Sequence, residues 1–285
     1  MNVIAMQPTS PAQNSMNIGS IPQRPTRHPS APIRQPNVIA VASGKGGVGK
    51  TWLSITLAHY FARQGIRTLL FDGDIGLANV DIQLGLMPDR DLGSVIAGRF
   101  GLADAVMPSE AGFDIIAGKS GSASLATLDQ AALNGLRDEL CQLARSYDKV
   151  VIDLGAGVDG VVRTLSQAAG TILVVTNDEP TALTDAYAFI KLARMADKTA
   201  DVRVVVNIAA TTREGERTYG KLNKAAENFL KFSPPLAGVI RRDEKVRDAI
   251  RNQMPLLTRH PMSDAAEDVE AIASSLTGAI AKARY

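Results

Sequence analysis

From Asn37 onward, short apolar runs rich in β-branched residues alternate along the chain with longer amphipathic stretches. Several runs are hydrophobic at every position rather than at every second one, as strands of a sheet covered on both faces require. The pattern predicts strands at Val38–Ala42, Thr68–Asp72, Phe113–Ile116, Val150–Asp153, Thr171–Thr176, Val202–Asn207 and Leu236–Ile240. It predicts helices near Lys50–Gln64, Asp129–Ser146, Gly160–Ala168, Thr181–Met195, Glu214–Phe232, Glu244–Asn252 and Asp264–Lys282. This alternation indicates a single doubly wound, mostly parallel α/β domain.

The first 36 residues differ from the rest of the chain. They hold seven of the fourteen prolines and three arginines, and they contain no acidic residue. Such a composition cannot bury enough apolar surface to offset the entropy lost on ordering. We therefore expect a disordered tail over residues 1–36 and one folded domain over residues 37–285.

Residue counts exclude several kinds of site. The single cysteine, Cys141, excludes a disulfide framework or a thiolate-bound metal cluster within one chain. The three histidines, at positions 28, 59 and 260, are scattered and do not suggest a histidine metal site or a Ser/His/Asp triad. No apolar run approaches the roughly 18–20 residues needed to cross a bilayer. We therefore expect a cytoplasmic protein. The net charge of the whole chain is +2, and the first 36 residues contribute three arginines to it, so the folded part is close to neutral.

The stretch Gly44–Thr51 matches the phosphate-binding pattern G-x-x-x-x-G-K-[ST]. It follows one predicted strand and opens a predicted helix, which is the context that the motif requires. In such a loop, backbone N–H groups converge on phosphate oxygens at the positive end of the helix. Lys50 would reach the β- and γ-phosphates, and Thr51 would place its hydroxyl on Mg²⁺. The sequence therefore predicts a nucleoside triphosphate site that uses magnesium.

Acidic residues end two of the predicted strands. Asp72 and Asp74 end the second strand, and Asp153 ends the apolar stretch Lys149–Asp153. Because ligands of a doubly wound sheet bind at the carboxyl ends of its strands, these carboxylates would lie near the γ-phosphate. There they can orient the attacking water or hold magnesium through its water shell. An acid at a strand end also serves as a turn or helix cap, so the residues alone leave both interpretations open.

Four stretches together carry a family resemblance. Lys45–Thr51 resembles the deviant Walker A motif of the MinD/ParA family of dimerising P-loop ATPases, and Asp72–Asp81 resembles the switch I of its MinD-type members. Asp178–Ala188 and Val239–Arg247 resemble the FlhG/FleN branch, which sets flagellar number and position. The resemblance extends from about Asn37 to the end of the chain.

The resemblance implies a fold, two cofactors and a set of site residues. It implies a MinD-like P-loop domain that binds ATP and Mg²⁺. The nucleotide would contact the loop residues Gly44, Lys45, Gly46, Gly47, Val48, Gly49, Lys50, Thr51 and Trp52. Asn207 would bind the adenine edge, and the loop with Arg242 and Asp243 would close over the nucleotide. Catalysis is assigned to Lys45, Lys50, Asp74 and Asp153, and the metal to Thr51, Asp74 and Asp153.

The resemblance also implies a mechanism and partners. Lys45 would reach into the ATP of a second subunit, so that ATP bridges a homodimer and slow, partner-regulated hydrolysis separates it. A flagellar GTPase, the C-ring or a transcriptional regulator would be the further partner. The last predicted helix places Val269, Ile272, Ala273, Leu276 and Ile280 on one face. That face would either make a weak peripheral membrane contact or dock on its own core.

Two departures from the family pattern and one alternative accompany this interpretation. Leu154 stands where a small or hydroxyl residue is usual, and Arg241 stands where proline is common; we expect either to slow turnover.

The alternative is a ParA-type chromosome or plasmid partition ATPase that binds DNA nonspecifically through a basic face. Basic residues do occur in Arg213–Lys231 and Arg241–Arg251, but acidic residues interleave with them. A mixed solvated surface is the preferred interpretation.

Overall fold

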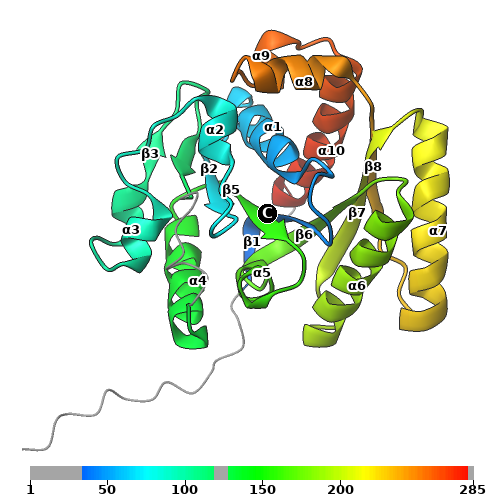
Figure 1. Cartoon of the computed structure of the whole chain (residues 1–285), viewed down its shortest axis with the longest axis horizontal. Coiled ribbons are helices and arrows are strands. Elements are labelled where there is room, and N and C mark those ends of the chain that lie inside the picture. The colour runs from blue at the N-terminus through cyan, green and yellow to red at the C-terminus, as the bar shows by residue number, and fades with distance from the viewer. Residues whose placement is uncertain (1–33, 119–127, 282–285) are drawn as a thin grey trace, which may run out of the picture. The chain divides into compact units, whose positions relative to one another are not determined.

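A mostly parallel sheet forms the centre of the computed structural model, which describes residues 34–118 and 128–281 (Figure 1). The strand order is β3-β4-β2-β5-β1-β6-β7-β8, and β3 alone in this sheet is antiparallel to its neighbour. The strands are β1 (Gln35–Ser43), β2 (Thr68–Gly73), β3 (Met107–Pro108), β4 (Asp114–Ile116), β5 (Lys149–Ala156), β6 (Ala169–Thr176), β7 (Asp201–Ala209) and β8 (Leu236–Arg241). Every strand predicted from the sequence is present. The predicted tail over residues 1–36 lies almost wholly outside the described residues.

Helices cover both faces of this sheet (Figure 1). One face carries α1 (Lys50–Arg63), α2 (Val80–Leu84), α8 (Glu244–Arg251), α9 (Leu256–Arg259) and α10 (Asp264–Ala281). The other carries α4 (Gln130–Ala144), α5 (Gly160–Ser166), α6 (Pro180–Ala196) and α7 (Thr212–Leu230). Two short elements, α3 (Leu92–Ile96) and the 3-10 helix η1 (Leu102–Ala105), lie between β2 and β4 in the chain. The sequence pattern predicted the long helices and missed these two, α2 and α9, which span little more than one turn and so show no repeated apolar face.

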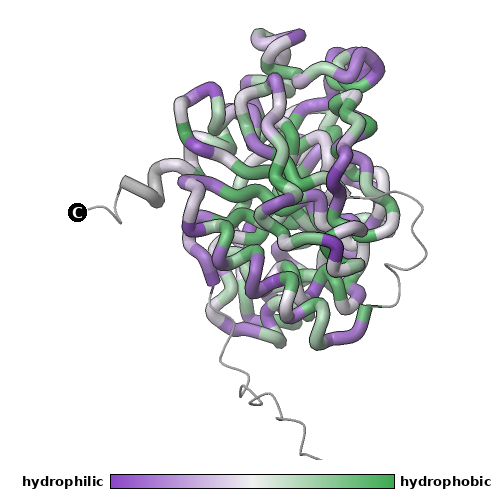
Figure 2. The backbone as a smooth tube through the Cα atoms, turned by 90° about the vertical axis from the view of Figure 1, so that its left-hand side faces the viewer, coloured by the Kyte–Doolittle hydropathy of each residue, from purple (hydrophilic) through white to green (hydrophobic). Residues whose placement is uncertain are grey.

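Alternate residues of the central strand β1 point into two separate hydrophobic clusters. Val38, Ala40 and Ala42 pack on the side of α4 to α7, whereas Ile39 and Val41 pack on the side of α1 and α10. Because side chains alternate between the two faces of a strand, a sheet covered on both sides needs apolar residues at every position. Hydrophobic residues accordingly run through the interior of the fold, while hydrophilic ones predominate at its outside (Figure 2).

The chain changes its direction of travel across the sheet at β1. Strands β2 and β5 lie on one side of β1, and β6, β7 and β8 follow on the other. In doubly wound sheets, the crevice at such a switch point, outside the carboxyl ends of the strands, is where ligands bind. The register places Asp72 of β2 beside Asp153 of β5, and Asp153 beside Val41 of β1. Two of the predicted acidic residues therefore lie in adjacent strands next to the loop that follows β1.

The C-terminal helix α10 docks on its own domain. Val269, Ile272, Ala273 and Leu276 are each at most 4% exposed and pack in the cluster with α1. The apolar face that the sequence offered as a membrane contact is thus covered at these four positions, and the side chain of Ile280 lies outside the described residues. Within residues 34–118 and 128–281, every helix is too short or too polar to cross a bilayer.

A buried lysine ties α10 to the sheet. Nζ of Lys149, at the start of β5, donates a hydrogen bond to the main-chain oxygen of Leu276 at 2.8 Å and lies 5.6 Å from the centroid of the Phe61 ring. Lys149 is 2% exposed. Burial, reinforced by the charge of Arg203, lowers the pKa of Lys149 to about 8.

This lowered pKa predicts a dependence of stability on pH. The folded chain releases the Lys149 proton near pH 8, whereas the unfolded chain holds it until about pH 10.4. The free energy of unfolding is therefore expected to rise as the pH rises from 8 to about 9.5. Urea unfolding should show this rise in the wild-type protein and not in Lys149→Met. An equal rise in both proteins would contradict the assignment.

Candidate functional site

The loop between β1 and α1 separates two cavities. The larger, of about 550 Å³, is lined by Gly46, Lys50, Thr51 and Asp74 among others. The smaller, of about 450 Å³, lies on the other side of Gly47 and Gly49. These two glycines have φ angles of +81° and +92°, in the left-handed region that glycine adopts without strain. They allow successive backbone N–H groups to turn toward one concave surface, as a phosphate-binding loop requires.

The first turn of α1 is open to an anion. Its leading N–H groups have no partner within the helix, and Gly49, which precedes it, has no side chain to cap them. Lys50 is only 7% exposed and its charge opposes the raised pKa values of Asp74 and Asp153. Unpaired N–H groups next to a buried cation form a site that fits phosphate oxygens.

Two carboxylates organise the chain around this site. Oδ1 of Asp153 accepts a hydrogen bond from the Ser54 hydroxyl at 3.0 Å, and the Thr51 hydroxyl also bonds to the Asp153 carboxylate. Asp72 accepts main-chain N–H bonds, each 3.2 Å long, from Asp74, Asn79 and Val80. Asp72 thereby closes the loop between β2 and α2, and it holds Asp74 at the edge of the larger cavity.

Burial raises the pKa values of these three acids. Burial and the charge of Asp153 raise the pKa of Asp72 to about 7. Burial raises the pKa of Asp153 to about 6, and it raises that of Asp74 too, in both cases against the attraction of Lys50. A divalent cation would favour the ionised carboxylates, and carboxylate and hydroxyl oxygens are ligands that Mg²⁺ accepts.

Magnesium fits this donor set for a second reason. Among the residues that the structure describes, no three His, Cys, Asp or Glu side chains form a complete metal cage. Mg²⁺ characteristically keeps several waters and completes its coordination with substrate phosphates instead. Thr51 and Asp74 line the larger cavity, and Asp153 is buried next to Thr51, so the three residues predicted to hold the metal lie at one end of this cavity.

The smaller cavity contains the residues expected at the nucleotide base. Asn207, which is 5% exposed, donates from Nδ2 to the main-chain oxygen of Val48 at 2.8 Å and so ties β7 to the loop. Arg242 lines the cavity and is exposed. Asp243 also lines it, but its carboxylate accepts from the backbone N–H of Lys245 at 2.9 Å and caps α8. Asp243 therefore positions the wall of the cavity.

The two departures from the family pattern point away from the phosphate site. Leu154 is fully buried in the core cluster on the side of α4 to α7. The guanidinium of Arg241 bonds to Asp268 at 2.9 Å and pairs with other acids at the start of α10. Both side chains therefore have structural partners, and an effect on turnover stays a prediction.

Lys45 has a partner within its own chain. Its Nζ pairs with Glu179 at 2.5 Å and donates to the Thr181 hydroxyl at 2.9 Å, both at the start of α6. The Lys45 and Glu179 side chains are 38% and 52% exposed. Lys45 also lowers the pKa of Glu179. The two lysines of the loop thus occupy different environments, Lys50 in the interior and Lys45 at the surface.

Comparison with known proteins decides the family. Residues 39–256 match the CobQ/CobB/MinD/ParA nucleotide-binding domain. The chain belongs to this family. The antiactivator FleN of Pseudomonas aeruginosa is 39% identical over 239 residues, which are 84% of this chain and 85% of FleN. The flagellum site-determining protein YlxH of Helicobacter pylori is 36% identical over 67% of this chain and 65% of YlxH.

Solved structures agree with the family. The septum site-determining protein MinD of Pyrococcus horikoshii, solved in complex with Mg-ADP, has a TM-score of 0.71 and 25% identity. The match covers 84% of this chain and 95% of that one. The predicted MinD-like P-loop fold is confirmed, and the family relationship supports ATP and Mg²⁺ as the cofactors.

The structure brings the predicted site residues into two groups around the loop. Gly46, Gly47, Gly49, Lys50, Thr51, Trp52 and Asp74 line the larger cavity, and Asn207, Arg242 and Asp243 line the smaller one. Gly44 packs on the backbone of Asp185, Val48 is buried beneath the loop, and Asp153 is buried behind Thr51. Their individual roles stay predictions.

Three residues of the site were missed from sequence. Ser54 hydrogen-bonds to Asp153, Asp159 lines the larger cavity, and Glu179 holds Lys45. Only Ser54 had a local signal, because it follows Lys50 by four residues and so lies on the same face of α1. The other two come from distant parts of the chain.

Gly49 gives a direct test of the loop geometry. A Cβ added there would lie 2.3 Å from Nδ2 of Asn207, at a φ of +92° that alanine adopts only with strain. Gly49→Ala is expected to lower the free energy of unfolding of the nucleotide-free protein by about 1–3 kcal/mol. It should also weaken ADP binding measured by calorimetry, because the loop must shift.

Gly46→Ala is the matched control for the unfolding measurement. Its added Cβ meets nothing within 4 Å, and its φ is not positive. Its unfolding free energy should stay within about 0.5 kcal/mol of wild type. Equal stability of the two variants would show that the loop does not need the geometry described at Gly49.

Proposed function

We propose that this protein is a Mg-ATP-dependent dimerisation switch that hydrolyses ATP slowly and regulates the number or placement of flagella. The arrangement of buried Lys50 with Asp74 and Asp153 around the open first turn of α1 carries the proposal for the chemistry. Similarity to FleN and YlxH over most of the folded part supports the biological assignment.

The residues of this chain divide the work of binding and hydrolysis. Lys50 and the first N–H groups of α1 bind phosphate oxygens, and Thr51 and Asp153 hold magnesium, Asp153 acting through water. Bound magnesium neutralises charge that develops on the phosphates. Asp74, half-buried at the edge of the larger cavity, orients the attacking water. On the other side of the loop, Asn207 and Arg242 receive the base.

Lys45 is the proposed contact to the second subunit. Its pairing with Glu179 joins two exposed side chains, and such pairs contribute little because water and salt screen the attraction. Lys45 can therefore leave Glu179 at little cost and reach the nucleotide of a facing subunit. A dimer that needs ATP at its interface follows from this arrangement, and hydrolysis separates it.

The proposed macromolecular partners are a transcriptional regulator, a flagellar GTPase or the C-ring. The transcriptional regulator is the first to test, since the relative FleN is named an antiactivator. We propose a cytoplasmic location, with recruitment to the cell pole or to the inner face of the membrane in the ATP state. Because α10 buries Val269 to Leu276 on its own core, any membrane contact would be weak and would use residues beyond them.

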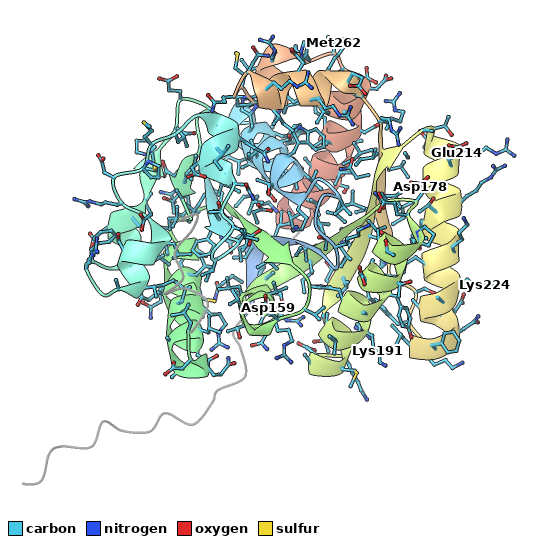
Figure 3. All side chains as sticks on the ribbon, viewed as in Figure 1. Asp159, Asp178, Lys191, Glu214, Lys224 and Met262 are labelled. Atoms are coloured by element: carbon cyan, nitrogen blue, oxygen red, sulfur yellow. The ribbon has the colours of Figure 1, made fainter. Side chains whose placement is uncertain are left out.

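A DNA-binding partition ATPase is the less favoured function. Helix α7 carries the basic residues that it would need, but charges of both signs project from it, as Glu214 and Lys224 show (Figure 3). The ParA-family ATPase of Chlorobium tepidum has a TM-score of 0.69 at 20% identity, a likeness of fold alone. A mixed surface does not concentrate the positive potential that nonspecific DNA binding requires.

Variants of the loop and of switch I test the biochemical part. Asp74→Ala is expected to bind ATP and remain dimeric, because hydrolysis stalls. Lys45→Ala should bind ATP with near wild-type affinity but stay monomeric, and Lys50→Ala should lose ATP binding. Calorimetry and light scattering with Mg-ATP measure both properties. An Asp74→Ala protein that stays monomeric, or a dimeric and active Lys45→Ala protein, would refute the switch.

Deletion of the gene tests the biological part. Flagella are counted and chromosome loci are tracked in the same cells, with the wild-type gene restored as the control. Extra or misplaced flagella with normal segregation are expected. Normal flagella with missegregated chromosomes would favour the partition ATPase instead.

A further inference from the structure

Two residues that line the larger cavity each contain a buried polar atom without a hydrogen-bond partner in the described structure. The atoms are Nε1 of Trp52, in the first turn of α1, and Oε1 of Gln83, in α2. Each exposes less than 1 Å² to solvent, and neither has a hydrogen-bond partner in the described structure. The indole Nε1–H can only donate, and the amide oxygen can only accept. The two atoms are therefore complementary to one another.

Their burial excludes bulk water as the partner in the present arrangement. A buried donor or acceptor left unpaired loses the hydrogen bond that it had to water in the unfolded chain. A movement that joins the two atoms would recover that loss for both at once. Helices α1 and α2 pack against one another, so the movement needed is a shift of one neighbouring helix along the other.

Helix α2 is the shorter and more exposed of the two helices. It has five residues, and of these Val80 alone is buried while Ile82 is 56% exposed. Gln253 donates a hydrogen bond of 3.0 Å from Nε2 to the oxygen of Ile82. The Asp72 carboxylate holds the first turn of α2 through the Val80 N–H, and Leu84 packs against the core. A further hydrogen bond would add to these few contacts.

We propose that Trp52 and Gln83 hydrogen-bond to one another, directly or through one enclosed water, when nucleotide occupies the larger cavity, and that this pair positions Asp74. The loop that carries Asp74 runs from β2 to the start of α2. Asp72 ties the two ends of that loop together through the N–H groups of Asn79 and Val80. A shift of α2 toward α1 thus moves Asp74 relative to Thr51, the neighbour of Trp52.

Trp52 and Gln83 are positioning residues in this proposal, because they act through the loop and touch no reacting atom. The proposal rests on the nucleotide site described above. The pair exists only if both the tryptophan and the glutamine are present, since phenylalanine cannot donate and methionine offers no amide oxygen. The two residues should therefore show coupled effects.

The single tryptophan of the chain allows a test without mutation. The full-length protein labelled with ¹⁵N gives one indole N–H resonance. Adding magnesium and a non-hydrolysable ATP analogue is expected to move this resonance downfield and to slow its exchange with solvent. An unchanged resonance, with analogue binding confirmed by calorimetry, would overturn the pairing and leave the nucleotide site intact. Failure of the analogue to bind would overturn the nucleotide site itself.

A double-mutant cycle tests the coupling. Trp52→Phe and Gln83→Met are each expected to lower kcat for ATP hydrolysis about two- to ten-fold, with a smaller change in KM. The double variant should lose no more than either single variant. Additive losses would overturn the pairing, and so would unchanged kcat values in variants shown to be folded by circular dichroism.

Asn223 supplies the matched control. Its Oδ1 is also a buried acceptor without a partner, but it lies in α7 on the opposite face of the sheet. Asn223→Leu should leave kcat unchanged and should not alter the effect of Trp52→Phe. Coupling of equal size between Trp52 and Asn223 would show that the cycle reports general loosening of the fold, and would overturn the pairing.

Discussion

Two buried carboxylates in adjacent strands, Asp72 and Asp153, cannot both carry charge at low cost, and the rest of the site is arranged around that constraint. The sheet fixes them side by side, so neither can move away from the other. Asp153 is supported by the hydroxyls of Thr51 and Ser54, and Asp72 by main-chain N–H groups of the loop that follows it. A bound cation or phosphate would change the charge around Asp72 and Asp153. Because the loop after β2 donates its N–H groups to Asp72, such a change would also affect that loop.

The fold could be predicted because the hydrophobic pattern of each strand and long helix repeats within a short stretch of sequence. Each buried strand is apolar at every position, and each long helix shows several turns of one amphipathic face. The misses are elements without that repetition. Strand β1 begins at Gln35, three residues before its predicted start, because Gln35, Pro36 and Asn37 give no apolar signal although Gln35 pairs with Ala169 of β6. Helices of four or five residues span little more than one turn, so their apolar positions do not repeat.

The site was predictable only where its residues are contiguous or end a strand. Gly44 to Thr51 are contiguous in the chain, Asp74 directly follows β2, and Asp153 lies near the end of the neighbouring strand β5, so their proximity follows from the topology. Side-chain direction does not follow from sequence spacing. Leu154 looked like a change to the site, yet its side chain packs into the core. The Arg241 guanidinium is held by acids of α10, although Arg241 also lines the smaller cavity. Glu179 lies in a stretch that carried the family resemblance, but its contact with Lys45 gave no signal, because it joins residues 134 positions apart.

The two lysines of the loop differ in how firmly the fold holds them, and that difference gives one loop two uses. Lys50 is buried among carboxylates, where moving it would expose unpaired charges in a medium of low dielectric constant. In the proposed function it binds the nucleotide of its own chain. Lys45 pairs with Glu179 at the surface, where water and salt screen the attraction. A loop with one fixed and one releasable cation can bind a nucleotide in its own subunit and still extend a charge toward another.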